Sequence, residues 1–189
     1  MWRVITCIAV WLPAAACAGP NAQSDSMVGH EANVRLGGGG QLEGAAVQSV
    51  IGEAGGYMEM EASLHDADRR DDARVYKAFS VGMSNRISLF GVLAPDHDLE
   101  RYLDLGASAG AAFSFVIGVP PHGGDGAFSA WVGAWVDIGT ISVRGGYLAV
   151  TGSVRREAYI DPWNDRTQLM IGLAWRQRRP MAQSVLRSL

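Results

Sequence analysis

The sequence predicts an all-β protein: an antiparallel meander β-barrel of about eight strands that follows an N-terminal signal and a tether. Apolar and non-apolar residues alternate with a period of two along much of the chain, and no long stretch shows the helical period. Glycine is frequent, at 24 of 189 residues. Hydrophobic residues make up 48% and charged residues 19%, which is enough apolar material for a folded domain and too little charge for disorder.

The first sixteen residues have the pattern of a secretory signal peptide. A short positive start, Met1-Trp2-Arg3, precedes an apolar run from Val4 to Leu12 and a group of small residues. The apolar run is too short for a comfortable membrane span. We therefore expect residues 1–16 to be a signal peptide that directs export.

The only cysteines are Cys7 and Cys17, and the first lies inside the signal. At most one cysteine then remains after cleavage, so no intrachain disulfide is possible. The segment Ala14-Ala15-Ala16-Cys17 resembles the lipobox of bacterial lipoproteins, with Ala14 where that family prefers Leu. The resemblance implies that Cys17 carries a lipid, and Ala18 after it implies sorting to the outer membrane. The alternative is ordinary signal-peptidase cleavage, which the same small residues allow.

After the signal, residues 17–30 are mostly small and polar and are expected to form a tether. The β-barrel domain is expected over 31–177 and a C-terminal tail over 178–189. Asn85 and Gly139-Thr140 are typical of tight turns, and 65–72, 95–100, 118–126 and 152–165 of loops. The expected strands are marked by strong alternation over Met58–Leu64, Val75–Met83, Arg101–Ile117, Phe128–Ile138 and Leu169–Trp175, and by weaker alternation over 31–41, 86–94 and 140–151.

The composition of the two strand faces favours an outer-membrane barrel over a soluble one. In a soluble barrel the apolar face points inward, whereas in an outer-membrane barrel it meets lipid and the polar face fills the lumen. The non-apolar face here holds mainly Gly, Ser and Ala with a few charges, which suits a narrow lumen. Trp131 and Trp135 would lie in that lumen or in an interfacial girdle. The expected lumen charge network comprises Glu59, Glu61, Arg74, Asp104, Asp137, Arg144, Arg166 and Arg176.

This pattern, over roughly residues 31 to 177, resembles the small eight-stranded outer-membrane β-barrel families. The resemblance implies a membrane-spanning barrel with lipid around its apolar face. It rests on strand pattern rather than on a signature motif.

The sequence shows no catalytic, cofactor-binding or metal-binding motif. The four histidines fall in segments expected to be loops or tether, and none has a serine and a carboxylate nearby in a recognisable pattern. In 65–72 the acidic residues flank Arg69 and Arg70, which favours a self-neutralising solvated loop over a Ca²⁺ site. The glycine run 37–40 lacks the lysine and the helix start of a phosphate-binding loop.

We therefore expect a non-enzymatic, outer-membrane-associated and lipid-tethered barrel with a structural or surface-interaction role in the cell envelope. Its partners would be membrane lipid, lipopolysaccharide and other envelope proteins, met through the loops at 65–72, 118–126 and 152–165. The formal net charge of −3 gives no electrostatic reason to expect nucleic acid. The alternatives are a lipid-tethered, lipocalin-like soluble barrel that binds a small apolar ligand, and a lipid-modifying envelope enzyme.

Overall fold

The computed structural model describes residues 25–53, 55–71, 74–93, 102–119, 123–143, 146–160 and 162–180. The predicted signal and Cys17 lie outside these residues, as do Arg144, His97 and His122. In the part that is described, no helix is both long and apolar enough to cross a membrane.

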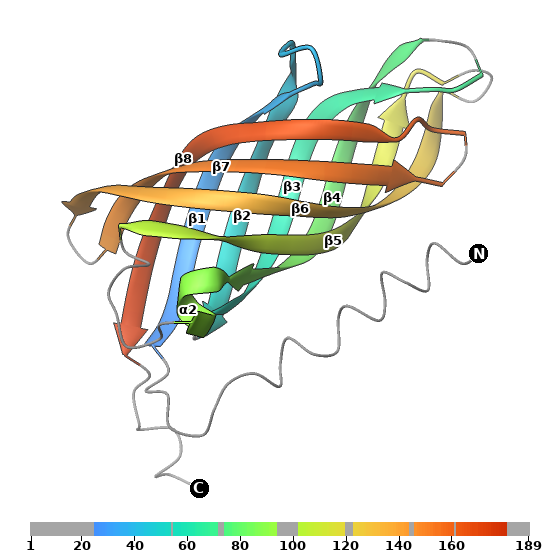
Figure 1. The fold of residues 1–189 in the computed structure, drawn as a ribbon. Coiled ribbons are helices and arrows are strands. Elements are labelled where there is room, and N and C mark those ends of the chain that lie inside the picture. The colour runs from blue at the N-terminus through green and yellow to red at the C-terminus, as the bar shows by residue number, and fades with distance from the viewer. Residues whose placement is uncertain are drawn as a thin grey trace, which may run out of the picture.

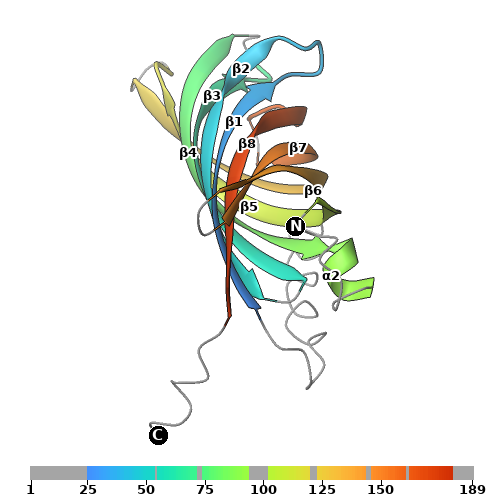
Figure 2. The ribbon, with the colours of Figure 1, turned by 90° about the vertical axis from the view of Figure 1, so that its left-hand side faces the viewer.

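The chain forms a closed barrel in which each strand pairs antiparallel with the next and β8 closes on β1 (Figures 1 and 2). This confirms the predicted all-β meander of eight strands. A short helix, α2 (Leu89–Leu93), lies between β4 and β5. The strands are β1 (Asp25–Leu36), β2 (Leu42–Glu53), β3 (Gly56–Asp68), β4 (Val75–Ser88), β5 (Leu103–Ile117), β6 (Gly124–Val143), β7 (Gly146–Tyr159) and β8 (Arg166–Pro180).

The barrel has two ends that differ in their connections. The terminal mouth holds the start of β1, the end of β8 and α2. The far mouth is the opposite end, where β1, β3, β5 and β7 end and β2, β4, β6 and β8 begin. α2 lies beside the terminal mouth in both ribbon views (Figures 1 and 2).

The register gives the tilt of the strands. A path along paired residues that leaves β1 at Ser26 passes through all eight strands and returns to β1 at Leu36, ten residues farther on. With a rise of ~3.3 Å per residue and a strand spacing of ~4.8 Å, this stagger requires a tilt of about 40°. At that tilt an apolar band ~25 Å tall needs about ten residues per strand. Every strand reaches that length.

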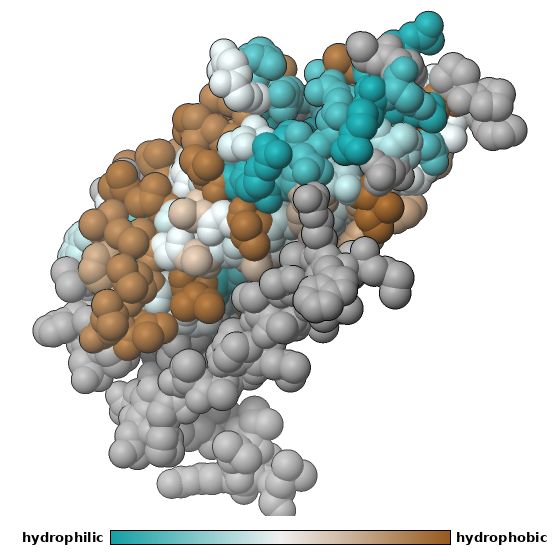
Figure 3. Space-filling view, turned by 45° about the vertical axis from the view of Figure 1, so that its right-hand side comes forward, coloured by the Kyte–Doolittle hydropathy of each residue, from teal (hydrophilic) through white to brown (hydrophobic). Residues whose placement is uncertain are grey.

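The strands alternate with their apolar side chains outward and their polar side chains inward. Along β4 the exposed residues include Phe79 and Val81, while the buried ones include Ser80 and Ser84. Phe113 on β5 is 58% exposed and Leu173 on β8 is 65% exposed. Figure 3 shows brown apolar side chains over the body of the barrel and teal polar ones toward the far mouth. The lipocalin-like alternative is therefore wrong, because such a barrel would hold its apolar residues inside.

One predicted strand is wrong, and one strand of the structure was not predicted. No separate strand begins at residue 86, because β4 continues to Ser88 and α2 begins at Leu89. The side-chain oxygen of Ser88 accepts a hydrogen bond of 2.9 Å from the backbone N–H of Gly91, which caps this short helix. Conversely β2, between Leu42 and Glu53, was not predicted. Its first half includes Gly44-Ala45-Ala46, where the two faces of the strand differ little.

Several predicted turns and loops lie inside strands. Asn85 belongs to β4, and Gly139 marks a register shift within β6, which continues to Val143. β1 begins at Asp25, inside the predicted tether, so His30 is a strand residue. His65 likewise belongs to β3 and is 2% exposed. Most of 152–165 belongs to β7, whose final residue is Tyr159.

Candidate functional site: a charged lumen capped by tryptophan

The lumen near the terminal mouth holds one layer of ion pairs. Arg86 donates to both Glu31 (2.8 Å) and Glu59 (2.7 Å), and so joins β4 to β1 and β3. Arg176 on β8 donates to Glu31 and, at 2.7 Å, to Asp137 on β6. Because these side chains are all buried, each charge depends on its partners for solvation. We call this set the terminal layer.

A second layer lies toward the far mouth. Arg155 donates two hydrogen bonds, of 2.8 and 3.1 Å, to Glu61 across the lumen, and Arg35 donates to the same carboxylate. Arg166 pairs with Glu157 at 2.9 Å, and Ser129 donates to Glu157 at 2.7 Å. We call this set the far layer. It connects strands on opposite sides of the barrel, since β3 faces β7.

The structure places the residues of the predicted charge network in several settings. Arg166 is partly buried at the edge of the far layer, and Arg144 lies outside the described residues. Arg74 is exposed in the turn before β4, so its assignment to the lumen was wrong. Its carbonyl oxygen accepts from the N–H of Arg69 in that turn. The members that are buried in the lumen are Glu59, Glu61, Asp104, Asp137 and Arg176.

Sequence reasoning missed half of the ion-pair partners. A usable signal was the spacing of two, because Glu31, Asn33 and Arg35 share one face of β1, as do Arg155 and Glu157 on β7. These segments had been interpreted as weak strand and as loop. The missed members are Glu31, Arg35, Arg86, Arg155 and Glu157.

Two tryptophans complete the packing of the lumen. Trp131 and Trp135 on β6 are each 4% exposed and lie inside, so neither is part of a girdle. The guanidinium of Arg155 lies 4.6 Å from the ring centre of Trp131, and that of Arg86 lies 5.3 Å from Trp135. Gly110 leaves room for the Trp131 ring, since a Cβ there would lie 2.5 Å from Trp131 Cζ2.

A histidine and two serines form a buried polar chain above the far layer. Nε2 of His65 lies 2.6 Å from Oγ of Ser80, which lies 2.5 Å from Oγ of Ser114. Nδ1 of His65 lies 2.9 Å from the carbonyl oxygen of Asp66 and 3.0 Å from Nη2 of Arg166. All three side chains are at most 3% exposed. His65 and Ser80 are thus spaced like a catalytic base and a nucleophile, but both side chains are buried inside the barrel.

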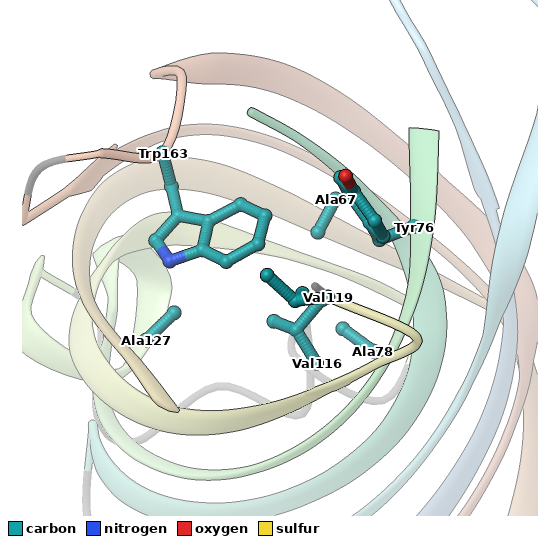
Figure 4. Close-up of a cluster of buried hydrophobic side chains, with 7 residues drawn as sticks. All are labelled: Ala67, Tyr76, Ala78, Val116, Val119, Ala127 and Trp163. Atoms are coloured by element: carbon teal, nitrogen blue, oxygen red, sulfur yellow. The ribbon is translucent and has the colours of Figure 1, made fainter. Parts of the chain in front are cut away.

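The far mouth is closed by the connection between β7 and β8. Residue 163 forms a β-bridge with Arg69, and the N–H of Asn164 donates to the carbonyl oxygen of Asp68 at 3.0 Å. Trp163 itself is 1% exposed and points into the barrel (Figure 4). Its ring packs edge-on against Tyr76, with 6.0 Å between the two ring centres. Small side chains beneath it complete the cluster: Ala67, Ala78, Val116, Val119 and Ala127. We call Trp163 and these residues the cap.

The loop interpreted as self-neutralising contains close charge pairs. Asp66 pairs with Lys77, and Nε of Arg69 lies 2.9 Å from a carboxylate oxygen of Asp71. Among the described residues, no group of three or more His, Cys, Asp or Glu side chains has a metal-binding arrangement.

A closed barrel of eight tilted strands, apolar outside and charged inside, has the fold of the small outer-membrane β-barrels. Comparison with solved structures supports this class of fold. The chain is similar to the N-terminal β-barrel domain of Pseudomonas aeruginosa OprF, with a TM-score of 0.51 and 12% identity over 81% of this chain and 98% of that one.

Two further solved structures show the same likeness. Neisserial surface protein A is 10% identical over 83% of this chain and 97% of its own, with a TM-score of 0.52. A major outer membrane protein from Thermus thermophilus is 10% identical over 80% and 99%, with a TM-score of 0.53. No family model and no curated protein sequence matches the chain. At these identities the likeness establishes the fold.

Proposed function

We propose that the protein is an outer-membrane barrel with a non-enzymatic, structural and surface-interaction role in the cell envelope. The observation that carries the proposal is the combination of an apolar exterior with a lumen filled by cross-barrel ion pairs. The exterior fits lipid, and the filled lumen leaves the exposed connections as the surfaces that meet other molecules.

The lipid anchor at Cys17 is part of this proposal. The stretch from Cys17 to the start of β1 at Asp25 is short, so a lipid on Cys17 and the terminal mouth would share one leaflet. For a lipoprotein sorted to the outer membrane, that leaflet is the periplasmic one. The far mouth then faces the cell surface.

Charged side chains on the outer wall near the far mouth support contact with lipid headgroups. Arg156 is 58% exposed on the outward face of β7, and Lys77 extends from β4 beside Asp66. In the proposed orientation these cations lie at the level of the phosphates of lipopolysaccharide. Membrane lipid, lipopolysaccharide and neighbouring envelope proteins are therefore the proposed partners.

The barrel's need for lipid is tested with a shortened chain that begins at Ser24, made in the cytoplasm. We expect it to be insoluble without detergent, and to fold in detergent into a form that migrates differently on a gel before and after heating. A soluble, monomeric, β-rich product in the absence of detergent would contradict the membrane barrel.

A charge on the outward face tests how deeply the barrel is embedded. Val132 lies midway along the outward face of β6 and is 54% exposed. Val132→Arg is expected to lower the free energy of unfolding from lipid vesicles by about 2–4 kcal/mol, because arginine would enter hydrocarbon. Ala158→Arg, outward on β7 close to the far mouth, is the control and is expected to cost about 0–1 kcal/mol. Equal costs at the two sites would argue against a membrane-spanning belt.

A further inference from the structure

Arg35 in the far layer is buried with most of its hydrogen-bonding capacity unused. Its side chain is 1% exposed, and Nη2 donates to Glu61. Within the described residues, Nε and Nη1 have no hydrogen-bond partner. A guanidinium carries five N–H donors, and a buried donor left without a partner is costly. Something other than the described side chains is therefore expected beside Arg35.

Further unpartnered polar atoms lie in the same part of the lumen. Gln168 is next to it on the neighbouring strand: Arg35 pairs with Met170 in the β1–β8 register, and Gln168 is two residues along the same inward face. The side-chain oxygen of Gln168, Oε1, accepts a hydrogen bond from Arg155. Its side-chain nitrogen, Nε2, has no partner among the described residues. The hydroxyl of Ser63 is likewise unpartnered there, and Ser63 follows Glu61 on the inward face of β3.

The far layer also has more positive than negative charge. Glu157 pairs with Arg166, but the single carboxylate of Glu61 receives both Arg35 and Arg155. Glu61 accepts from Gln48 as well, at 2.7 Å, so its oxygens are saturated. Glu43, half-buried near the far mouth, lies within electrostatic reach of Arg166 and Arg35, but among the described residues no hydrogen bond joins it to Arg35. The far layer thus places three guanidinium groups against two buried carboxylates, and Arg35 shares its carboxylate with Arg155.

We propose that the far layer encloses a small monovalent anion of the halide class, chloride in the first instance. Nε and Nη1 of Arg35, Nε2 of Gln168 and the hydroxyl of Ser63 would bind it. Water could satisfy the same donors but would leave the surplus charge of Arg35 uncompensated in a low-dielectric interior. The cap above and the ion pairs below favour a monatomic ion over a bulky one. The anion would be a structural component of the folded barrel.

The proposal predicts that chloride and bromide stabilise the barrel specifically. The full chain is refolded in detergent and unfolded with urea in sodium chloride, sodium bromide or sodium gluconate at the same ionic strength, since gluconate is too large for the site. For a halide concentration a hundred times the dissociation constant, the urea midpoint is expected to be about 1 M higher than in gluconate. Equal midpoints in the three salts would overturn the proposal in favour of water.

Two variants separate an anion site from general destabilisation. Gln168→Glu places a carboxylate beside Arg35, and its urea midpoint should no longer depend on halide while staying at least as high as that of the parent in gluconate. Arg35→Gln removes the surplus charge and should also abolish the halide effect. Arg156→Gln, which removes an exposed cation, is the control and should keep the effect. Halide dependence that survives in Gln168→Glu or in Arg35→Gln would refute the site.

A direct observation completes the test. In crystals grown in bromide, an anomalous scattering peak is expected within hydrogen-bonding distance of Arg35 Nε or Nη1. If bromide replaces all chloride in the buffer and no such peak appears beside Arg35, the site is refuted. This result would stand even if the variants failed to refold.

Discussion

Glu61→Gln is expected to lower the free energy of unfolding by about 3–5 kcal/mol, because it leaves two buried guanidinium groups without their carboxylate. Glu61 is 4% exposed and is the carboxylate that Arg35 and Arg155 share, so it joins β1 and β7 through β3. The amide keeps the shape of the side chain but not its charge. Urea unfolding in detergent, followed by tryptophan fluorescence, measures the loss.

The control for Glu61 is an ion pair on the outer wall. Lys77 pairs with Asp66, and the Lys77 side chain is 76% exposed. Lys77→Gln is expected to cost at most about 1 kcal/mol, since exposed pairs contribute little. A Glu61→Gln loss no larger than that of Lys77→Gln would show that water enters the lumen and solvates the arginines, contrary to the packed interior described above.

Trp163→Ala is expected to cost about 3–5 kcal/mol, because it empties the centre of the cap. The indole packs against Tyr76 and lies over Val116 and Ala78, both at most 1% exposed. Truncation also removes the ring over which the guanidinium of Arg69 lies, 6.0 Å from its centre. The far mouth should open as a result. Urea unfolding gives the cost, and faster amide hydrogen exchange at the start of β4 and the end of β5 would report the opening.

Trp163→Phe is the matched variant for the cap. The indole Nε1 has no hydrogen-bond partner among the described residues, so its removal sacrifices no polar contact. Phenylalanine keeps an aromatic ring against Tyr76, and we expect a cost well below that of alanine. If the two substitutions cost the same, an interaction of the indole nitrogen, rather than the packing of the ring, holds the mouth closed.

The period-two pattern was sufficient to predict an eight-stranded barrel with its apolar side outward, yet it misassigned individual elements. The strand count came out right because the unpredicted β2 was offset by a false strand at 86–94. Alternation identifies a strand only where its two faces differ, and Gly44-Ala45-Ala46 has nearly identical faces. The helix after Ser88 depends on a side-chain cap, which hydropathy does not register.

The sequence by itself determined which side chains share a face, because successive residues of a strand point to opposite sides of the sheet. That is why Glu59, Glu61, Asp104 and Asp137 could be assigned to the lumen before any pairing was known. Only the tertiary structure decided their partners. Glu61 meets Arg155, 94 positions away, because the ten-residue stagger brings β3 and β7 to the same level across the lumen. The cap likewise depends on the tertiary structure. Trp163 closes the far mouth because closure of the barrel brings it next to Arg69, and a local sequence pattern cannot predict contact between residues so far apart in the chain.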